Sequence, residues 1–233
     1  LWSRLATRVL LQLWEWDGKD GDSIYQNARE FPWQDHLQSN QTFAISFHGT
    51  NQHIRHPHYG SQRLKDGLVD HFRDSTGIRP NVDPKNPEVS FWAHLEADQL
   101  KLSLDFSGVS LHQRGYRQHQ GSTSLKENLA AALLWQCGWP MKAKHGDTLL
   151  DPMCGSGTIL AEGLLMAADW APGLIRKKFG FQAWRGFEFE TWKRLRLEAI
   201  ERRADGLNGL PPIIGGDHSC LLYTSPSPRD DEL

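Results

Sequence analysis

Apolar side chains in the first half of the chain alternate at the period of strands in three places. Residues 4–16 and 41–48 are rich in branched and aromatic side chains, which predicts two strands. Residues 89–108 form two alternating runs around the polar stretch 96–99, which predicts a β-hairpin. The strand pattern indicates a sheet with one apolar face.

Two helices are predicted between these strands. The segment DSIYQNAREF, residues 22–31, has helical spacing, and Asp22 or Ser23 is placed to cap its start. From residue 58 the apolar side chains recur at helical spacing up to Gly77, which is a typical helix stop. Mixed strands and helices in this order predict an α+β domain over residues 1–113.

The pattern changes after Gly108. A basic loop leads into a helix that Ser122, Thr123 or Ser124 could cap, and a new domain is predicted over residues 114–219.

This second domain shows the order strand, glycine turn, helix. DTLLDP predicts a short buried strand, CGSGT a turn, and ILAEGLLMAADWA a helix beginning near Thr158. PPIIGGD, residues 211–217, predicts the second strand of the same sheet, which has the βα order of a nucleotide-type α/β sheet. Residues 220–233 have neither a period nor a cap and are interpreted as an artefactual or disordered tail.

The glycine turn DPMCGSGT is the most informative stretch for function. A phosphate-binding P-loop needs a Lys before the Ser or Thr, and Gly157 occupies that position. A dinucleotide fingerprint needs a third Gly where Leu160 stands. A ligand with a carboxylate and an ammonium group fits better, because Asp151 could accept from the ammonium and the helix N-terminus could hold the carboxylate. S-adenosylmethionine has both groups.

Asp217 follows the second predicted strand and two glycines. A carboxylate in that position can accept both ribose hydroxyls of a nucleoside, although a surface turn would also use an Asp.

Composition narrows the class of protein only slightly. A net charge of −2 and a pI near 6.6 give no global basic signature, so RNA contacts must come from a local patch. The 3 cysteines lie far apart without nearby histidines at ligand spacing, which disfavours disulfides and a metal site. No apolar run is long enough for a membrane span, and a cytoplasmic location is expected.

Basic and aromatic residues precede the glycine turn in the segment 114–126. Arg114, Tyr116, Arg117 and Lys126 are suited to phosphate contacts and base stacking, although a solvated linker would carry similar charges. Arg63 and Lys65, on the second predicted helix, are further candidates for RNA backbone contacts.

Other candidate residues favour structural roles. Glu162 suits the dipole of the helix that contains it, and a direct cofactor contact is the alternative. His53, His56 and His58 are expected on an exposed turn rather than around a metal. Trp184, Phe187 and Trp192 are expected to pack in the interior.

Several longer motifs in this order carry a family resemblance. They are HYGSQRLKDGLVDHFR, LDFSGVSLHQRGYR, SLKENLAAALL and LLDPMCGSGTILAEGLLMAADWAPGL. Over residues 1–217 the chain resembles the N-terminal part of bacterial 23S rRNA guanine-N2 methyltransferases of the RlmL/RlmKL type, which join a THUMP RNA-binding domain to a Rossmann-like methyltransferase domain.

The resemblance implies a binding site for S-adenosylmethionine and 23S rRNA as the partner, with neither a metal nor a membrane involved. The residues expected to border the methyl donor are Asp151, Pro152, Cys154, Gly155, Ser156, Gly157 and Thr158, with Asp217 at the ribose. The family's catalytic tetrapeptide Asn-Pro-Pro-Tyr does not occur in this sequence, so no catalytic residue is assigned and the chain by itself is expected to be inactive. A stand-alone THUMP RNA-binding module and a THUMP-type tRNA guanine-N2 methyltransferase are the alternatives.

Overall fold

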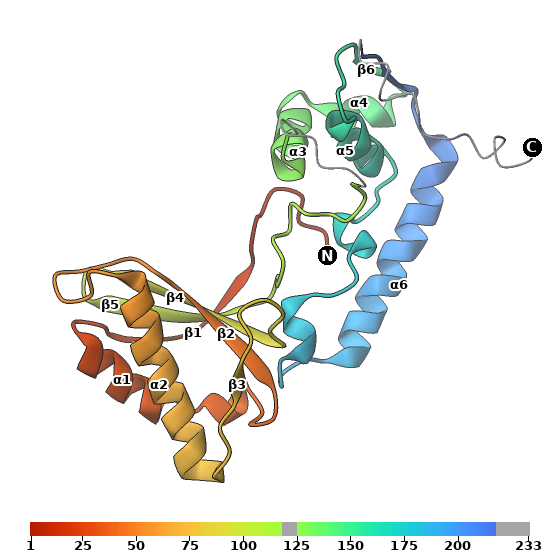
Figure 1. Ribbon diagram of the computed structural model, residues 1–233. Coiled ribbons are helices and arrows are strands. Elements are labelled where there is room, and N and C mark those ends of the chain that lie inside the picture. The colour runs from red at the N-terminus through yellow and green to blue at the C-terminus, as the bar shows by residue number, and fades with distance from the viewer. Residues whose placement is uncertain (118–124, 218–233) are drawn as a thin grey trace, which may run out of the picture. The chain divides into compact units, whose positions relative to one another are not determined.

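The computed structural model describes residues 1–117 and 125–217, which divide into two units (Figure 1). Unit 1 contains Leu1–Thr7, Leu111–Lys177 and the described residues from Phe189 onward. Unit 2 contains Arg8–Ser110 and Lys178–Glu188. Each unit is therefore assembled from stretches that are separated in the sequence.

Unit 2 contains a five-stranded sheet with the strand order β1-β5-β4-β2-β3. Its strands are β1 (Leu10–Asp17), β2 (Thr42–His48), β3 (Asn81–Val82), β4 (Val89–Glu96) and β5 (Gln99–Asp105). β4 and β5 form the predicted antiparallel hairpin, and β2 runs parallel to β4. The tight turn places Ala97 at a φ of 53°.

The helices of unit 2 confirm the predicted helical segments, with one correction at a cap. They are α1 (Gly21–Glu30), α2 (Pro57–Thr76), and the 3-10 helices η1 (Trp33–Asp35) and η3 (Gly180–Ala183). Helix α1 is capped by Asp20 rather than by Asp22 or Ser23, because Asp20 and Ser23 form a reciprocal capping box. Helix α2 ends as predicted at Gly77, whose φ of 71° suits glycine.

The two faces of this sheet differ in character. Helices α1 and α2 cover one face (Figure 1), where alternate side chains such as Phe43, Phe91 and Leu102 are buried in a single core. The helices cross closely at Gly67, where an added Cβ would lie 2.6 Å from the Ala28 Cβ. The register of β2 and β4 places Ser46 beside Trp92, on the face opposite to this core.

The first strand begins later than predicted. Residues 4–7 were expected to be part of it, but β1 starts at Leu10 and residues 1–7 belong to unit 1. The Arg4 guanidinium donates to the carbonyls of Leu165 and Trp170 at 2.8 and 2.9 Å. These side-chain contacts within unit 1 explain why the apolar pattern alone placed the start of the strand wrongly.

Unit 1 contains the predicted strand, glycine turn and helix. Its elements are α3 (Glu127–Gln136), α4 (Trp139–Lys144), β6 (Leu149–Asp151), α5 (Thr158–Ala167), η2 (Pro172–Ile175), α6 (Phe189–Gly206), η4 (Leu207–Gly209) and β7 (Ile213–Gly215). β6 and β7 pair in parallel, which confirms that the PPIIGGD segment supplies the second strand of this sheet.

The start of α3 and the exposure of β6 bear on two predictions for unit 1. The cap candidates Ser122, Thr123 and Ser124 lie outside the described residues, and α3 begins after Lys126 without a side-chain cap. The expectation that β6 is buried is wrong, since Leu150 is 62% exposed. The reason is that β6 has one strand neighbour, β7, in the described part of the chain.

Over residues 1–117 and 125–217, none of the helices combines the length and the apolar character that a membrane crossing requires. In the same ranges, His, Cys, Asp and Glu side chains do not gather into a group that could hold a metal ion. The predicted tail, residues 220–233, lies outside the described residues.

Candidate functional site

The ends of β6 and β7 bring the two predicted carboxylates to one edge of the sheet. The register pairs Asp151 with Gly215. The Gly216 N–H donates to the Asp151 carbonyl at 2.9 Å, and the Cys154 N–H donates to the Gly216 carbonyl at the same distance. Because the carboxyl ends of parallel strands form the ligand-binding edge in this fold class, the turn and Asp217 share one site.

The turn between β6 and α5 depends on its glycines. Gly155 and Gly157 have φ values of 51° and 72°, a region that side chains with a Cβ rarely adopt. A Cβ added at either position would have no described heavy atom within 4 Å. The space beside the turn is therefore open, and the turn leads directly into Thr158, the first residue of α5.

Asp217 contacts the turn directly. Its Oδ2 accepts a hydrogen bond from the Gly155 N–H at 2.8 Å. Asp151 accepts from the Met153 N–H through its Oδ1 at 3.2 Å. Two carboxylates therefore lie at the turn, while the first N–H groups of α5, which have no acceptor within the helix, lie at its other end. This arrangement offers acceptors for cationic or hydroxyl groups and donors for an anion.

The thiol of Cys154, within the turn, stays protonated. Desolvation by the surrounding protein raises the pKa of Cys154, and the nearby charges of Asp151 and Asp217 raise it further. A raised pKa disfavours the thiolate, which is the reactive form of cysteine. Cys154 therefore contributes an uncharged side chain to the turn. Gly215 packs close to this side chain, because a Cβ at residue 215 would lie 3.1 Å from the Cys154 Sγ.

A buried ion pair behind the turn corrects the RNA-facing assignment of Arg114. Arg114 is 1% exposed, and its Nε lies 3.4 Å from the Glu162 Oε1. The same guanidinium donates to the carbonyls of Leu111 and Arg4. Since these acceptors are internal, Arg114 is not available to a phosphate in this structure.

Glu162 is fully buried and does not simply complement the helix dipole. Its Oε1 also accepts from the Tyr116 hydroxyl at 3.1 Å. Burial raises the pKa of Glu162, and the charge of Arg114 opposes that rise. Sequence reasoning missed this pair, although a charged residue within the apolar helix sequence ILAEGLLMAA was a signal that a partner was needed.

Arg117 connects the same segment to the glycine turn. Its guanidinium donates to the Thr158 hydroxyl at 3.1 Å and to the Leu125 carbonyl at 2.9 Å. It also lies 3.5 Å from the Glu127 carboxylate. The hydroxyls of Ser156 and Thr158 are 3.2 Å apart, so the turn, α5 and the 114–117 segment form one connected group.

The remaining RNA candidates lie elsewhere. Lys126 is exposed just before α3. On α2, Arg63 donates to the Gly21 carbonyl at 3.0 Å and to Asp22 at 2.8 Å, and the Lys65 ammonium lies 3.2 Å from Asp66. Both α2 cations therefore already have acidic partners.

The three histidines are exposed and the three aromatic side chains pack against the protein, as predicted. His53, His56 and His58 are exposed around the start of α2. Trp184 packs against the core of unit 2 with its ring 5.6 Å from that of Phe106, and Trp192 is buried in α6. Phe187 is half-buried, 5.8 Å from the ring of Phe181.

Comparison with known families assigns both parts of the chain. Residues 18–105 match the THUMP domain, and residues 114–220 match the family described as RMKL-like, methyltransferase domain. Curated relatives match 93% of the chain, at 48% identity over 217 residues in Allochromatium vinosum and over 216 residues in Pseudomonas aeruginosa. Both relatives are ribosomal RNA large subunit methyltransferases K/L.

Through its THUMP match and its methyltransferase match, the chain is similar to RlmKL-type ribosomal RNA methyltransferases. It spans about 30% of the length of these RlmKL relatives. Its fold class is a THUMP-containing α+β unit together with part of a Rossmann-like methyltransferase domain, as predicted.

Solved structures share this fold. A predicted N6-adenine-specific DNA methylase from Listeria monocytogenes has a TM-score of 0.80 and 27% identity, covering 95% of this chain and 57% of that chain. The structure of SMU.472 complexed with SAH has a TM-score of 0.73 and 22% identity, covering 98% of this chain and 65% of that chain. The second likeness concerns the fold alone.

Proposed function

We propose that the chain is the donor-binding and RNA-binding segment of an S-adenosylmethionine-dependent enzyme that methylates the exocyclic amine of a guanine in 23S rRNA. The names of its curated relatives support ribosomal RNA as the substrate. One observation carries the donor assignment. The glycine turn and Asp217, 62 residues apart, meet in a 2.8 Å hydrogen bond at the ends of two parallel strands.

The described residues fit each part of this donor. The open space beside Gly155 and Gly157 admits a ligand close to the backbone. The N-terminal N–H groups of α5 would hold the donor carboxylate, and Asp151 would accept from its ammonium. Asp217 would accept from the ribose hydroxyls. When bound, the donor supplies a methyl group activated by a sulfonium.

The protein's part in such a reaction is mainly positioning. A guanine amine attacks an activated methyl in line, so acceptors that orient the amine matter more than a strong base. The tetrapeptide Asn-Pro-Pro-Tyr, which would provide those acceptors by family resemblance, does not occur in the sequence. We therefore propose that the 233-residue chain binds the donor but does not transfer the methyl group, and that it acts in the cytoplasm.

Replacing Gly157 with Ala is expected to weaken binding of S-adenosylmethionine to the chain by at least about tenfold, or about 1.4 kcal/mol. The residue has a φ of 72°, and the added methyl would enter the open space beside the turn. Isothermal titration of the chain with the donor measures the change.

Gly77→Ala is the matched control for this titration. Gly77 also has a positive φ, 71°, with no described atom within 4 Å of an added Cβ, but it belongs to unit 2. Both substitutions strain the backbone by about 1–2 kcal/mol. The donor affinity of Gly77→Ala should equal that of the original chain. Equal affinities in all three proteins, or no uptake of the donor by the original chain, would refute the site.

The substrate assignment has its own experiment. A longer protein that contains this segment should transfer a radiolabelled methyl group from the donor to 23S rRNA. Methylation of tRNA and not of rRNA would favour a THUMP-type tRNA methyltransferase. RNA binding without any donor uptake would favour a stand-alone RNA-binding module.

A further inference from the structure

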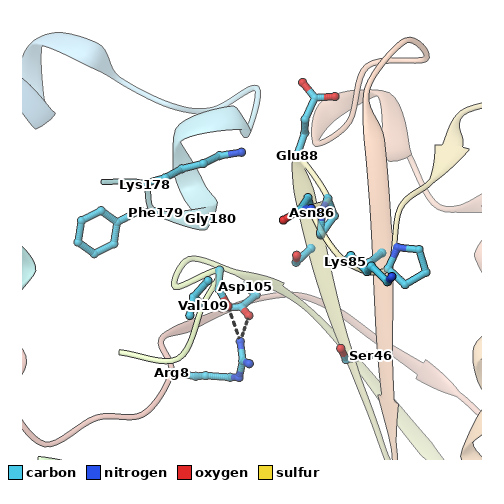
Figure 2. A pocket seen from close by; sticks show the side chains of 15 residues that line it. Arg8, Ser46, Lys85, Asn86, Glu88, Asp105, Val109, Lys178, Phe179 and Gly180 are labelled. Carbon is cyan, nitrogen blue, oxygen red and sulfur yellow. Dashed lines mark hydrogen bonds and ion pairs between the residues drawn. The ribbon is translucent and has the colours of Figure 1, made fainter. Parts of the chain in front are cut away.

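A hollow of about 290 Å³ lies within unit 2 (Figure 2). Its lining includes Ser46, which lies on the sheet face opposite the core. Its floor includes Ser46 of β2, Ser90 of β4 and Asp105 of β5. One wall is the loop 84–88 and another is the segment 178–180. Small side chains on neighbouring strands leave this space open.

Three of the charged groups around the hollow already have partners within the protein. The Arg8 guanidinium forms an ion pair with Asp105, donates to the Gly108 carbonyl at 2.9 Å and lies over the Trp92 ring. The Glu88 Oε2 accepts from the Thr42 N–H at 2.8 Å.

Lys85 and Lys178 give the lining a small excess of positive charge over the carboxylates of Asp105 and Glu88. Figure 2 shows them on different walls, Lys85 on the loop and Lys178 on the opposite segment. Among the hydrogen bonds and ion pairs of the described residues, neither ammonium group has a partner. Two ammonium groups without partners at a hollow favour an anion.

The backbone of both walls is well fixed. A Cβ on Gly180 would lie 2.3 Å from the Asp105 carbonyl oxygen, so the segment 178–180 packs directly on the end of β5. The opposite loop is tied to the sheet by the Asp83 N–H, which donates to the Phe43 carbonyl at 3.0 Å, and the Lys85 N–H donates to the Asp83 carboxylate at 3.0 Å. The backbone positions of the two lysines are therefore set before a ligand arrives.

We propose that this hollow binds a phosphate of the RNA backbone through Lys85 and Lys178. This inference rests on the proposed RNA substrate. The Ser46 hydroxyl and the Asn86 amide in the lining add neutral donors for phosphate oxygens.

An aromatic pair beside the hollow favours a nucleotide over a free phosphate ion. The register pairs Ser46 with Trp92, and the exposed His48 ring stacks on Trp92 with centroids 4.0 Å apart. Unpaired RNA bases stack on such rings, so a single strand can place a phosphate in the hollow and a base on His48.

The hollow combines residues from both family matches. Lys85 lies within the THUMP match, residues 18–105, whereas Lys178 lies within the methyltransferase match, residues 114–220. Both nevertheless fold into unit 2. A protein consisting only of residues 18–105 would therefore lack Lys178, one of the two lysines that bind the phosphate.

The test measures binding of the 233-residue chain to a 23S rRNA transcript by filter retention at several salt concentrations. A single phosphate contact to a single strand contributes a salt slope of about 0.7, which is about fivefold in affinity at 0.1 M salt. Lys178→Ala and Lys85→Ala should each lose about that much affinity and slope. Lys177→Ala, at the exposed lysine next in sequence to Lys178, and Lys19→Ala, at an exposed lysine outside the hollow, should each change the affinity less than twofold.

Three results would overturn the proposal. The first is that Lys178→Ala binds the transcript as tightly as Lys177→Ala does. The second is that inorganic phosphate raises the melting temperature of the original chain but not of Lys178→Ala while their RNA affinities stay equal, which would mark a free-phosphate site. The third is that the original chain does not bind the transcript. The donor titration is independent of all three, because neither lysine lies in unit 1.

Discussion

Replacing Arg114 with Ala is expected to lower the free energy of unfolding of unit 1 by about 3–5 kcal/mol at pH 7. Arg114 and Glu162 are 1% and 0% exposed, so the substitution leaves a buried carboxylate without its cation. Among residues 1–117 and 125–217, the Glu162 Oε2 already has no hydrogen-bond partner. Urea denaturation followed by circular dichroism, with the transitions of the two units resolved, measures the loss.

The loss should shrink in acid. Burial raises the pKa of Glu162 above its ordinary value of 4.5, and removing the Arg114 charge takes away the main opposing effect. A carboxyl group whose pKa is higher in the folded than in the unfolded protein favours folding at a pH below its unfolded-state pKa. This contribution to the free energy of unfolding is lost as the pH rises through the folded-state pKa. The difference between the Arg114→Ala variant and the original chain should therefore be smaller at pH 4.5 than at pH 7.

Arg194→Ala provides the matched control in unit 1. Arg194 is exposed on α6, and its removal should change stability by no more than about 0.5 kcal/mol. If Arg114→Ala costs as little as this control, or if its cost is the same at both pH values, the Glu162 ion pair does not stabilise the site as described.

Replacing Gly180 with Val is expected to destabilise unit 2 by about 3 kcal/mol, at the upper end of overpacking penalties. The first added carbon would lie 2.3 Å from the Asp105 carbonyl oxygen and 2.8 Å from the Gly108 nitrogen, and both are backbone atoms. Because the backbone cannot rotate away as a side chain does, the segment 178–188 must separate from β5. Faster amide hydrogen exchange in this segment would report the separation.

The matched control is Gly209→Val, since a Cβ at Gly209 would have no described heavy atom within 4 Å. It should leave the exchange of residues 178–188 unchanged. Gly180→Val should also lose the RNA affinity assigned to Lys178. Unchanged exchange in the Gly180→Val variant would show that the segment does not depend on this close contact.

Local patterns in the sequence predicted much of the fold. The hairpin of β4 and β5, the end of α2 at Gly77 and the start of α5 at Thr158 each depend on residues close together in the chain. The meeting of the glycine turn with Asp217 was also predictable, because parallel strands that follow one another in a Rossmann-like order end at the same edge.

The contacts that the sequence did not predict join residues far apart in the chain. Arg114 was assigned to RNA because the segment RGYR is locally basic, whereas its acceptors include Glu162, 48 residues away, and the Arg4 carbonyl, 110 residues away. Trp184 was correctly expected to pack, but the hydrogen bond from its indole N–H to His36 spans 148 residues. Periodicity and spacing carry no information about such pairings.

The placement of residues 178–188 in unit 2 has a consequence for biosynthesis. The ribosome must first make residues 111–177, which belong to unit 1, and this takes roughly 3–13 s at about 5–20 residues per second. During that interval the Phe106 ring of the nascent sheet cannot pack against Phe181 and Trp184, because these two residues have not yet been synthesised. Translation pauses before codon 178 would lengthen this vulnerable period, so synonymous changes there should alter the yield of folded protein.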